Sequence, residues 1–172
     1  TPVVKEVLGP DAESVALAWR FPGLASKDFE VLQVVSQVLY NGKAGLIDLD
    51  LNQQQKVLNS YGYPMGLADY SALLLGGLPK QGQTLEEVKD LLLSEIKKLR
   101  AGEFDEKMLQ ANINNFKLYE LQSMESNEGR ADIFVNSFIN GTNWEDEVTA
   151  IDRMAKLTKE DIVAFADKYL KE

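Results

Sequence analysis

Alternating side chains define the first recognisable element of the chain. Between Ser14 and Phe21, large apolar residues occupy every second position, with small or polar residues between them. A period of two is typical of a β-strand that turns one face toward a core. Two later segments, 56–63 and 70–78, are rich in Val, Tyr and Leu. They predict two more strands, connected through residues 64–66.

Helical periodicity accounts for most of the remaining chain. Ser26 is a suitable N-cap for a helix over residues 27–40, whose apolar residues surround most of its circumference and predict deep burial. The mixed pattern of residues 45–55 favours a short helix. Capping-box sequences begin at Thr84 and Thr158. Further helices are expected at about 84–101, 105–124, 127–139, from 143 onward, and 158–170.

The order of these elements is strand, helix, strands and then several helices. This order predicts an α+β fold, in which a mostly antiparallel sheet carries helices on one face. No internal repeat is visible, so residues 1–172 are expected to form a single domain. Because the chain begins with Thr1 rather than Met, we expect it to have been excised from a longer protein.

Two residue types are missing from the chain. It contains no histidine and no cysteine, so it supplies neither the imidazole nor the thiolate ligands of a structural zinc site. A thiol nucleophile and a Ser-His-Asp triad are excluded for the same reason. The sequence therefore predicts no catalytic residue and no metal ligand of its own.

Charge and hydropathy narrow the choice of partners. The formal net charge is −9 and no basic stripe is present, which argues against binding to nucleic acid. The longest notable apolar run, Leu73–Leu75, is far shorter than the roughly 20 residues that span a bilayer. Neither nucleic acid nor membrane is expected as a partner.

One short motif resembles a calcium loop. Asp48, Asp50 and Asn52 have the spacing of the first ligands of an EF-hand. The position that requires glycine holds Gln53, and the closing glutamate is replaced by Asn59. The motif is therefore interpreted as the polar face of a helix.

Four segments of the sequence resemble, in their order and spacing, a domain of the pitrilysin/insulinase-type (inverzincin) zinc metallopeptidases. They are Val15–Gly23 (VALAWRFPG), Asp28–Gly45 (DFEVLQVVSQVLYNGKAG), Leu78–Leu109, and Leu157–Leu170 (LTKEDIVAFADKYL). Together they extend over nearly the whole chain. Members of this family are built from repeated α/β domains, and two halves close around an unfolded peptide.

The resemblance also indicates which domain of the family this is. The catalytic domain carries an H-x-x-E-H helix that binds zinc and supplies a glutamate as general base. The equivalent positions here are Gln33, Ser36 and Gln37. Amides and a hydroxyl neither hold zinc at neutral pH nor take a proton from its water. The resemblance therefore implies the non-catalytic domain, with zinc bound by a partner catalytic domain.

In active members the non-catalytic domain also lends an arginine and, seven residues later, a tyrosine to the substrate. One register places Asn52 and Asn59 at these positions, so both functions are lost. The other places Lys56 and Tyr63 there. The first register is preferred because Leu51-Asn52 suits the family's Leu-Arg context.

Three residues are nevertheless the candidate substrate-binding residues: Tyr61, Tyr63 and Lys56. The alternative interpretation of the two tyrosines is simple alternation in a strand.

The resulting hypothesis is the non-catalytic half of a zinc metallopeptidase. Such a half walls the peptide chamber, offers a strand edge or groove to an extended peptide, and pairs with a zinc-bearing domain. The alternative is a non-enzymatic scaffold or peptide-binding protein on the same fold. The sequence leaves the compartment open between the bacterial periplasm and the cytoplasm.

Overall fold

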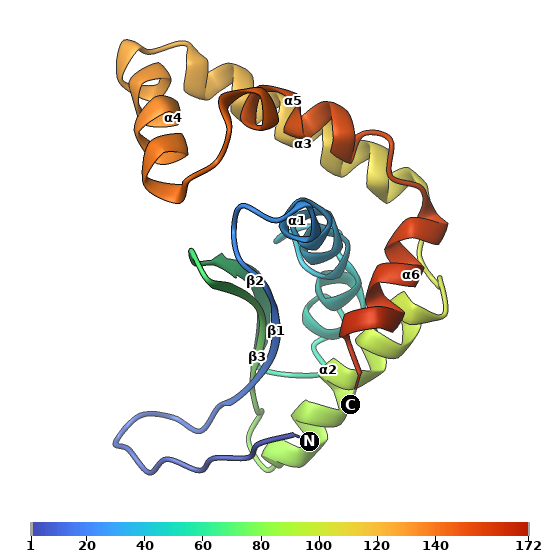
Figure 1. Cartoon of the computed structure of the whole chain (residues 1–172). Helices are drawn as coiled ribbons and strands as arrows, with labels where there is room; N and C mark the ends of the chain where they lie inside the picture. The colour runs from blue at the N-terminus through green and yellow to red at the C-terminus, as the bar shows by residue number, and fades with distance from the viewer. Residues whose placement is uncertain (1, 172) are drawn as a thin grey trace.

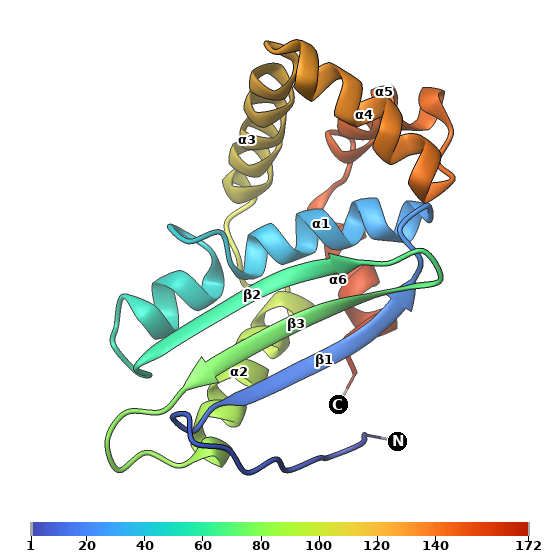
Figure 2. The same cartoon turned by 90° about the vertical axis from the view of Figure 1, so that its left-hand side faces the viewer.

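The computed structural model describes residues 2–171 and contains one three-stranded antiparallel sheet. Its strands are β1 (Val15–Pro22), β2 (Asn59–Gly66) and β3 (Tyr70–Leu78), with β3 in the centre. Figure 2 shows the three strands side by side, with the helices behind them and above them. The predicted α+β class and the antiparallel sheet are confirmed.

Helices cover one face of this sheet and leave the other open (Figure 1). Helices α1, α2 and α6 pack against the strands, whereas α3, α4 and α5 form a helical arm that packs on α1 beyond the β2 edge. The helices are α1 (Lys27–Leu39), the short π-helical turn η1 (Asp48–Asn52), α2 (Leu85–Arg100), α3 (Lys107–Met124), α4 (Asn127–Asn140), α5 (Trp144–Met154) and α6 (Lys159–Tyr169).

The second strand differs from its prediction. It begins at Asn59 rather than at residue 56, and it continues through Pro64 to Gly66, where a connection was expected. Proline is accepted here because β2 is an edge strand, hydrogen-bonded only to β3. The chain therefore turns later, between Gly66 and Tyr70.

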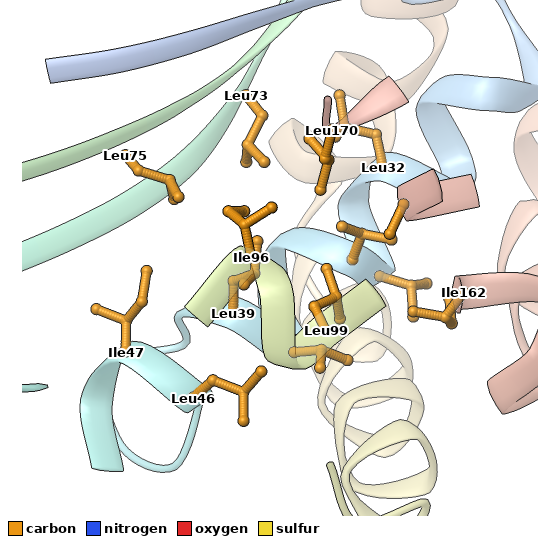
Figure 3. Close-up of a cluster of buried hydrophobic side chains, with 14 of the residues drawn as sticks. Leu32, Leu39, Leu46, Ile47, Leu73, Leu75, Ile96, Leu99, Ile162 and Leu170 are labelled. Carbon is orange, nitrogen blue, oxygen red and sulfur yellow. The ribbon is translucent and has the colours of Figure 1, made fainter. Parts of the chain in front are cut away.

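The hydrophobic core lies between the sheet and helices α1, α2 and α6 (Figure 3). Leu73 and Leu75 of β3 point into it from the sheet, and Phe21 enters from β1. The predicted deep burial of α1 is confirmed, because apolar residues all around this helix are fully enclosed. The labelled members of the core are Leu32, Leu39, Leu46, Ile47, Leu73, Leu75, Ile96, Leu99, Ile162 and Leu170.

Local capping fixes where the core helices begin. The Thr84 hydroxyl accepts a hydrogen bond from the backbone N–H of Glu87, whose carboxylate accepts one from the Thr84 N–H. Thr158 and Asp161 form the same reciprocal pair at α6. Each cap satisfies backbone amides that would otherwise lack partners and contributes about 1 kcal/mol. Both predicted capping boxes are confirmed.

Candidate functional site: an open sheet face beside a substituted helix

Helix α1 carries Gln33, Ser36 and Gln37, the residues that the sequence resemblance equates with the H-x-x-E-H motif. Gln33, Ser36 and Gln37 follow the i, i+3, i+4 spacing and therefore share one side of the helix. Ser36 is fully buried, and its hydroxyl has no hydrogen-bond partner. Gln33 is half-buried and borders two hollows of about 430 and 400 Å³ on either side of the contact between α1 and the helical arm.

These positions do not fit a zinc ion. Two neutral amides and a buried hydroxyl offer no anionic or imidazole ligand. Among residues 2–171, no cluster of three acidic, histidine or cysteine side chains is arranged to hold a metal ion. Helix α1 therefore supplies no group that would hold zinc or activate its water.

The calcium-like motif is divided among three structural roles. Asp48 is buried and accepts hydrogen bonds from the backbone N–H groups of Asn41 and Gly45, both at 2.9 Å. Asp50 pairs with Lys98 at 2.6 Å. The amide of Asn52 is bonded to the next strand. The three side chains therefore have separate partners, and the expected polar helix face is only partly right, because Asp48 is buried.

Asn52 and Asn59, the preferred equivalents of the family's arginine and tyrosine, have separate environments. The Asn52 amide bonds to the backbone and hydroxyl of Ser60, a fully buried residue. Asn59 is exposed at the start of β2. Asn52 therefore has a structural role, because its side chain joins η1 to β2. The sequence did not reveal this role.

Lys56 and Tyr63, the pair of the second register, lie in a loop and in a strand. Lys56 is exposed in the loop ahead of β2, where its carbonyl accepts a hydrogen bond from Gln83 Nε2 at 3.0 Å. Tyr63 lies in the middle of β2. A substrate role for Lys56 stays a prediction.

The two candidate tyrosines lie on the open face of the sheet. Their rings are stacked, with centroids 6.3 Å apart and planes inclined by 15°. Tyr61 lies opposite Gly76 of β3 in the strand register. A Cβ atom added at Gly76 would overlap the Tyr61 ring, so the missing side chain allows the ring to lie flat across β3. Tyr63 is 46% exposed and is available for contact.

The rest of the open face is largely apolar. Met65 and Tyr70 are exposed large side chains near the β2–β3 hairpin. The Arg20 guanidinium lies 3.4 Å from the centre of the Tyr70 ring, a cation–π contact that places a positive charge on this face. Alanines from β1 and β3 supply small side chains between the larger groups. The face thus offers aromatic and aliphatic surface with one flanking cation.

Strand β1 provides a second accessible feature. In residues 2–171 it pairs only with β3, which leaves its outer edge without a strand partner. A hollow of about 650 Å³ lies along this edge and is bordered by Leu17, Trp19 and Leu93, and also by residues 2–4 of the N-terminal segment. Unpaired strand edges and adjacent apolar hollows are the features that bind extended peptides.

A partly buried charge cluster joins η1 to α2. Lys98 Nζ bonds to Asp50 Oδ2 at 2.6 Å and to Glu95 Oε1 at 2.9 Å, and Glu95 is fully buried. Burial raises the pKa of the Glu95 carboxyl above its ordinary value. The hydrogen bond from Lys98 lowers the pKa of Asp50. The cluster stabilises the segment that precedes β2 and lies away from the open face.

Comparison with known proteins supports the interpretation of the fold. Residues 1–116 match the family model described as Peptidase M16 inactive domain. The chain is 26% identical over 168 residues to the zinc protease PqqE of Helicobacter pylori, covering 95% of this chain and 37% of that protein. These matches confirm the resemblance drawn from the sequence.

Solved structures show the same fold. A protease from Helicobacter pylori superposes with a TM-score of 0.84 at 22% identity, covering 92% of this chain and 38% of that one. The inactive peptidase domain of a candidate zinc protease from Bordetella parapertussis gives a TM-score of 0.79 at 17% identity, covering 97% of this chain and 92% of that one. The chain thus spans less than two fifths of the Helicobacter relatives and nearly all of the Bordetella domain.

Proposed function

Because the chain belongs to the M16 peptidase family, as a domain of the inactive type, we propose that it acts as the non-catalytic half of a zinc metallopeptidase. The observation that carries the proposal is the substituted helix α1. In the register that the resemblance implies, Gln33, Ser36 and Gln37 stand where the catalytic domain has its H-x-x-E-H residues, and the fold of the family is retained. Zinc and the general base then belong to a partner domain of the same family.

The open sheet face is the part of this chain that walls the peptide chamber. Tyr61, Tyr63 and Met65 supply broad apolar contacts that do not depend on one particular side chain of the substrate. The unpaired edge of β1 offers backbone donors and acceptors to an extended peptide, while the hollow beside it accommodates side chains. Such a surface favours unfolded polypeptide over folded protein, because only an extended backbone pairs with a strand edge.

A peptidase assay tests the proposal. The chain alone, supplied with zinc, is expected to show no cleavage of an unfolded, fluorescently quenched peptide. Addition of the H-x-x-E-H domain encoded in the same or the neighbouring reading frame is expected to produce zinc-dependent cleavage that neither component shows alone. Zinc-dependent turnover by the isolated chain would contradict the proposal, as would full activity of the H-x-x-E-H domain without it.

A second candidate is a non-enzymatic scaffold or peptide-binding protein on the same fold. The environment of Asn52 favours this candidate. If Asn52 stands at the family's arginine position, its side chain is engaged in hydrogen bonds to Ser60 and offers no positive charge to a transition state. The scaffold hypothesis predicts that no H-x-x-E-H domain accompanies the chain in its reading frame or in neighbouring genes. Finding such a domain with a downstream glutamate would favour the peptidase half.

A further inference from the structure

Helix α4 is weakly attached to the rest of the domain. It runs for 14 residues from Asn127 to Asn140 and contacts mainly its neighbours α3 and α5. Ser137 is its one buried residue. Its other notable attachment is Phe134, whose ring stacks on Trp144 of α5 with centroids 4.2 Å apart. Little of the helix is therefore secured by packing within residues 2–171.

The exposed side of α4 is apolar. Val135, Phe138 and Ile139 follow the i, i+3, i+4 spacing and share one side of the helix. Phe138 is 88% exposed and Ile139 is 68% exposed. These three residues are called the α4 face below. Surface helices ordinarily turn such a stripe toward a core, and this one points away from the domain.

The exposed stripe has a physical consequence. A helix of this length is only marginally stable by itself, because most helical stability comes from packing of the apolar face. In α4 that face is more than half exposed among residues 2–171, while the polar residues Asn136 and Asn140 border the hollow next to α1. The sequence of α4 is therefore suited to a helix that another molecule covers.

We propose that the α4 face docks onto the zinc-bearing domain, an inference that rests on the proposed function. Two observations identify this occupant. First, the chain spans only 37% of the Helicobacter zinc protease, so in that relative most of the polypeptide lies outside the matched part. Second, α4 stands on the same side of the molecule as the open sheet face (Figure 2). A domain that closes over the chamber wall therefore reaches α4 as well.

Charge argues against other occupants. Glu125, Glu128 and Asp132 are exposed on and beside α4, so the apolar face has an acidic surround. A second copy would bring the same acidic surround and the same net charge of −9. Anionic lipid would be repelled for the same reason. The occupant is expected to present an apolar hollow bordered by lysine or arginine.

Binding measurements with point variants test the inference. Ile139→Ser and Phe138→Ser are compared with Leu58→Ser, a control that removes an equally exposed apolar side chain (68%) from the loop before β2. Calorimetric titration with the separately expressed H-x-x-E-H domain is expected to show an affinity loss of about tenfold or more for the α4 variants. The control is expected to bind as the wild type does. Because the replaced side chains are exposed, circular dichroism melts of all three are expected to match the wild type.

The outcomes separate this inference from the proposed function. Equal binding by all variants would overturn the docking role of α4 and leave the peptidase-half proposal standing. Absence of binding by the wild-type chain would overturn both. A wild-type dimer that Phe138→Ser converts to a monomer, or wild-type binding to phosphatidylglycerol vesicles that this variant abolishes, would assign the α4 face to a different occupant and overturn the inference.

Discussion

The side chain of Asn52 is joined to Ser60 by three hydrogen bonds, each 2.8 Å long. Asn52 Nδ2 donates to the Ser60 carbonyl, while Oδ1 accepts from both the backbone N–H and the hydroxyl of Ser60. Ser60 is fully buried, so no solvent replaces these bonds. One amide thus connects the η1 turn to the first part of β2, the strand that carries both candidate tyrosines.

Replacement of Asn52 by alanine is expected to destabilise the domain by about 2–3 kcal/mol, because it leaves buried donors and an acceptor of Ser60 without partners. Urea unfolding monitored by circular dichroism measures the change. Asn59→Ala, at the exposed position seven residues later, is the control and is expected to stay within about 0.5 kcal/mol of the wild type. Equal stability of both variants would show that the Asn52–Ser60 bonds contribute nothing to folding.

The buried Glu95 carboxyl gives the stability a pH dependence. Because burial raises its pKa in the folded state, the protonated carboxyl favours folding, and this contribution is lost as the pH rises through the raised pKa. Glu95→Gln removes the titration and keeps the shape. Its stability relative to the wild type is expected to increase from about pH 4 to about pH 8. Urea midpoints measured across this range test the direction, and a constant difference would contradict it.

Asp50 titrates in the opposite sense. The hydrogen bond from Lys98 lowers the pKa of Asp50 in the folded state. The ionised carboxylate therefore stabilises the fold above the pKa of the unfolded chain, and this stabilisation is lost as the pH falls through the pKa of the folded state. Asp50→Asn is therefore expected to cost stability at neutral pH and to approach the wild type under acid conditions. Unfolding midpoints of both proteins at neutral and acid pH provide the measurement. A destabilisation by Asp50→Asn that grows toward acid pH would contradict the stabilising role of the Asp50 carboxylate.

Gly76 and Tyr61 are expected to be coupled. Gly76→Ala places a methyl group where the Tyr61 ring lies, and we expect a loss of about 1 kcal/mol as the ring swings off β3. In a Tyr61→Ala background the same substitution is expected to cost much less. A double-mutant cycle by thermal unfolding measures the coupling, and additive effects would mean that the ring does not depend on the glycine.

Tyr63 is expected to contact substrate in the assembled peptidase. Tyr63→Ala should raise KM about fivefold or more, with little change in domain stability, because the side chain is half-exposed on the open face. Tyr119→Ala removes a tyrosine that is 66% exposed on α3 and serves as the control. Unchanged KM for Tyr63→Ala would remove this residue from the substrate site.

The same assay separates the two sequence registers. If Asn52 and Asn59 stand at the family's arginine and tyrosine positions, Lys56→Ala is expected to leave kcat unchanged. A fall in kcat for both Lys56→Ala and Tyr63→Ala, without a corresponding rise in KM, would instead support the register that retains Lys56 and Tyr63.

Short-range patterns predicted much of the fold. The alternation at 14–21, the capping boxes at Thr84 and Thr158 and the apolar residues around most of α1 each depend on neighbouring residues, and each is present in the structure. The end of β2 was predicted wrongly, because Pro64-Met-Gly66 has the composition of a turn. Pairing with Leu73 and the position at the sheet edge override that local preference.

By itself, the sequence determined which side chains this chain lacks: without histidine and cysteine it supplies no imidazole or thiolate ligand and no thiol nucleophile, whatever its fold. It also determined the α+β class, because periodicity is a property of neighbouring residues. Only the tertiary structure decided that Asn52 forms hydrogen bonds with Ser60, that Tyr61 lies over Gly76 and that the apolar side of α4 is exposed. These relations depend on which elements pack together, and residues distant in sequence meet only after the chain has folded.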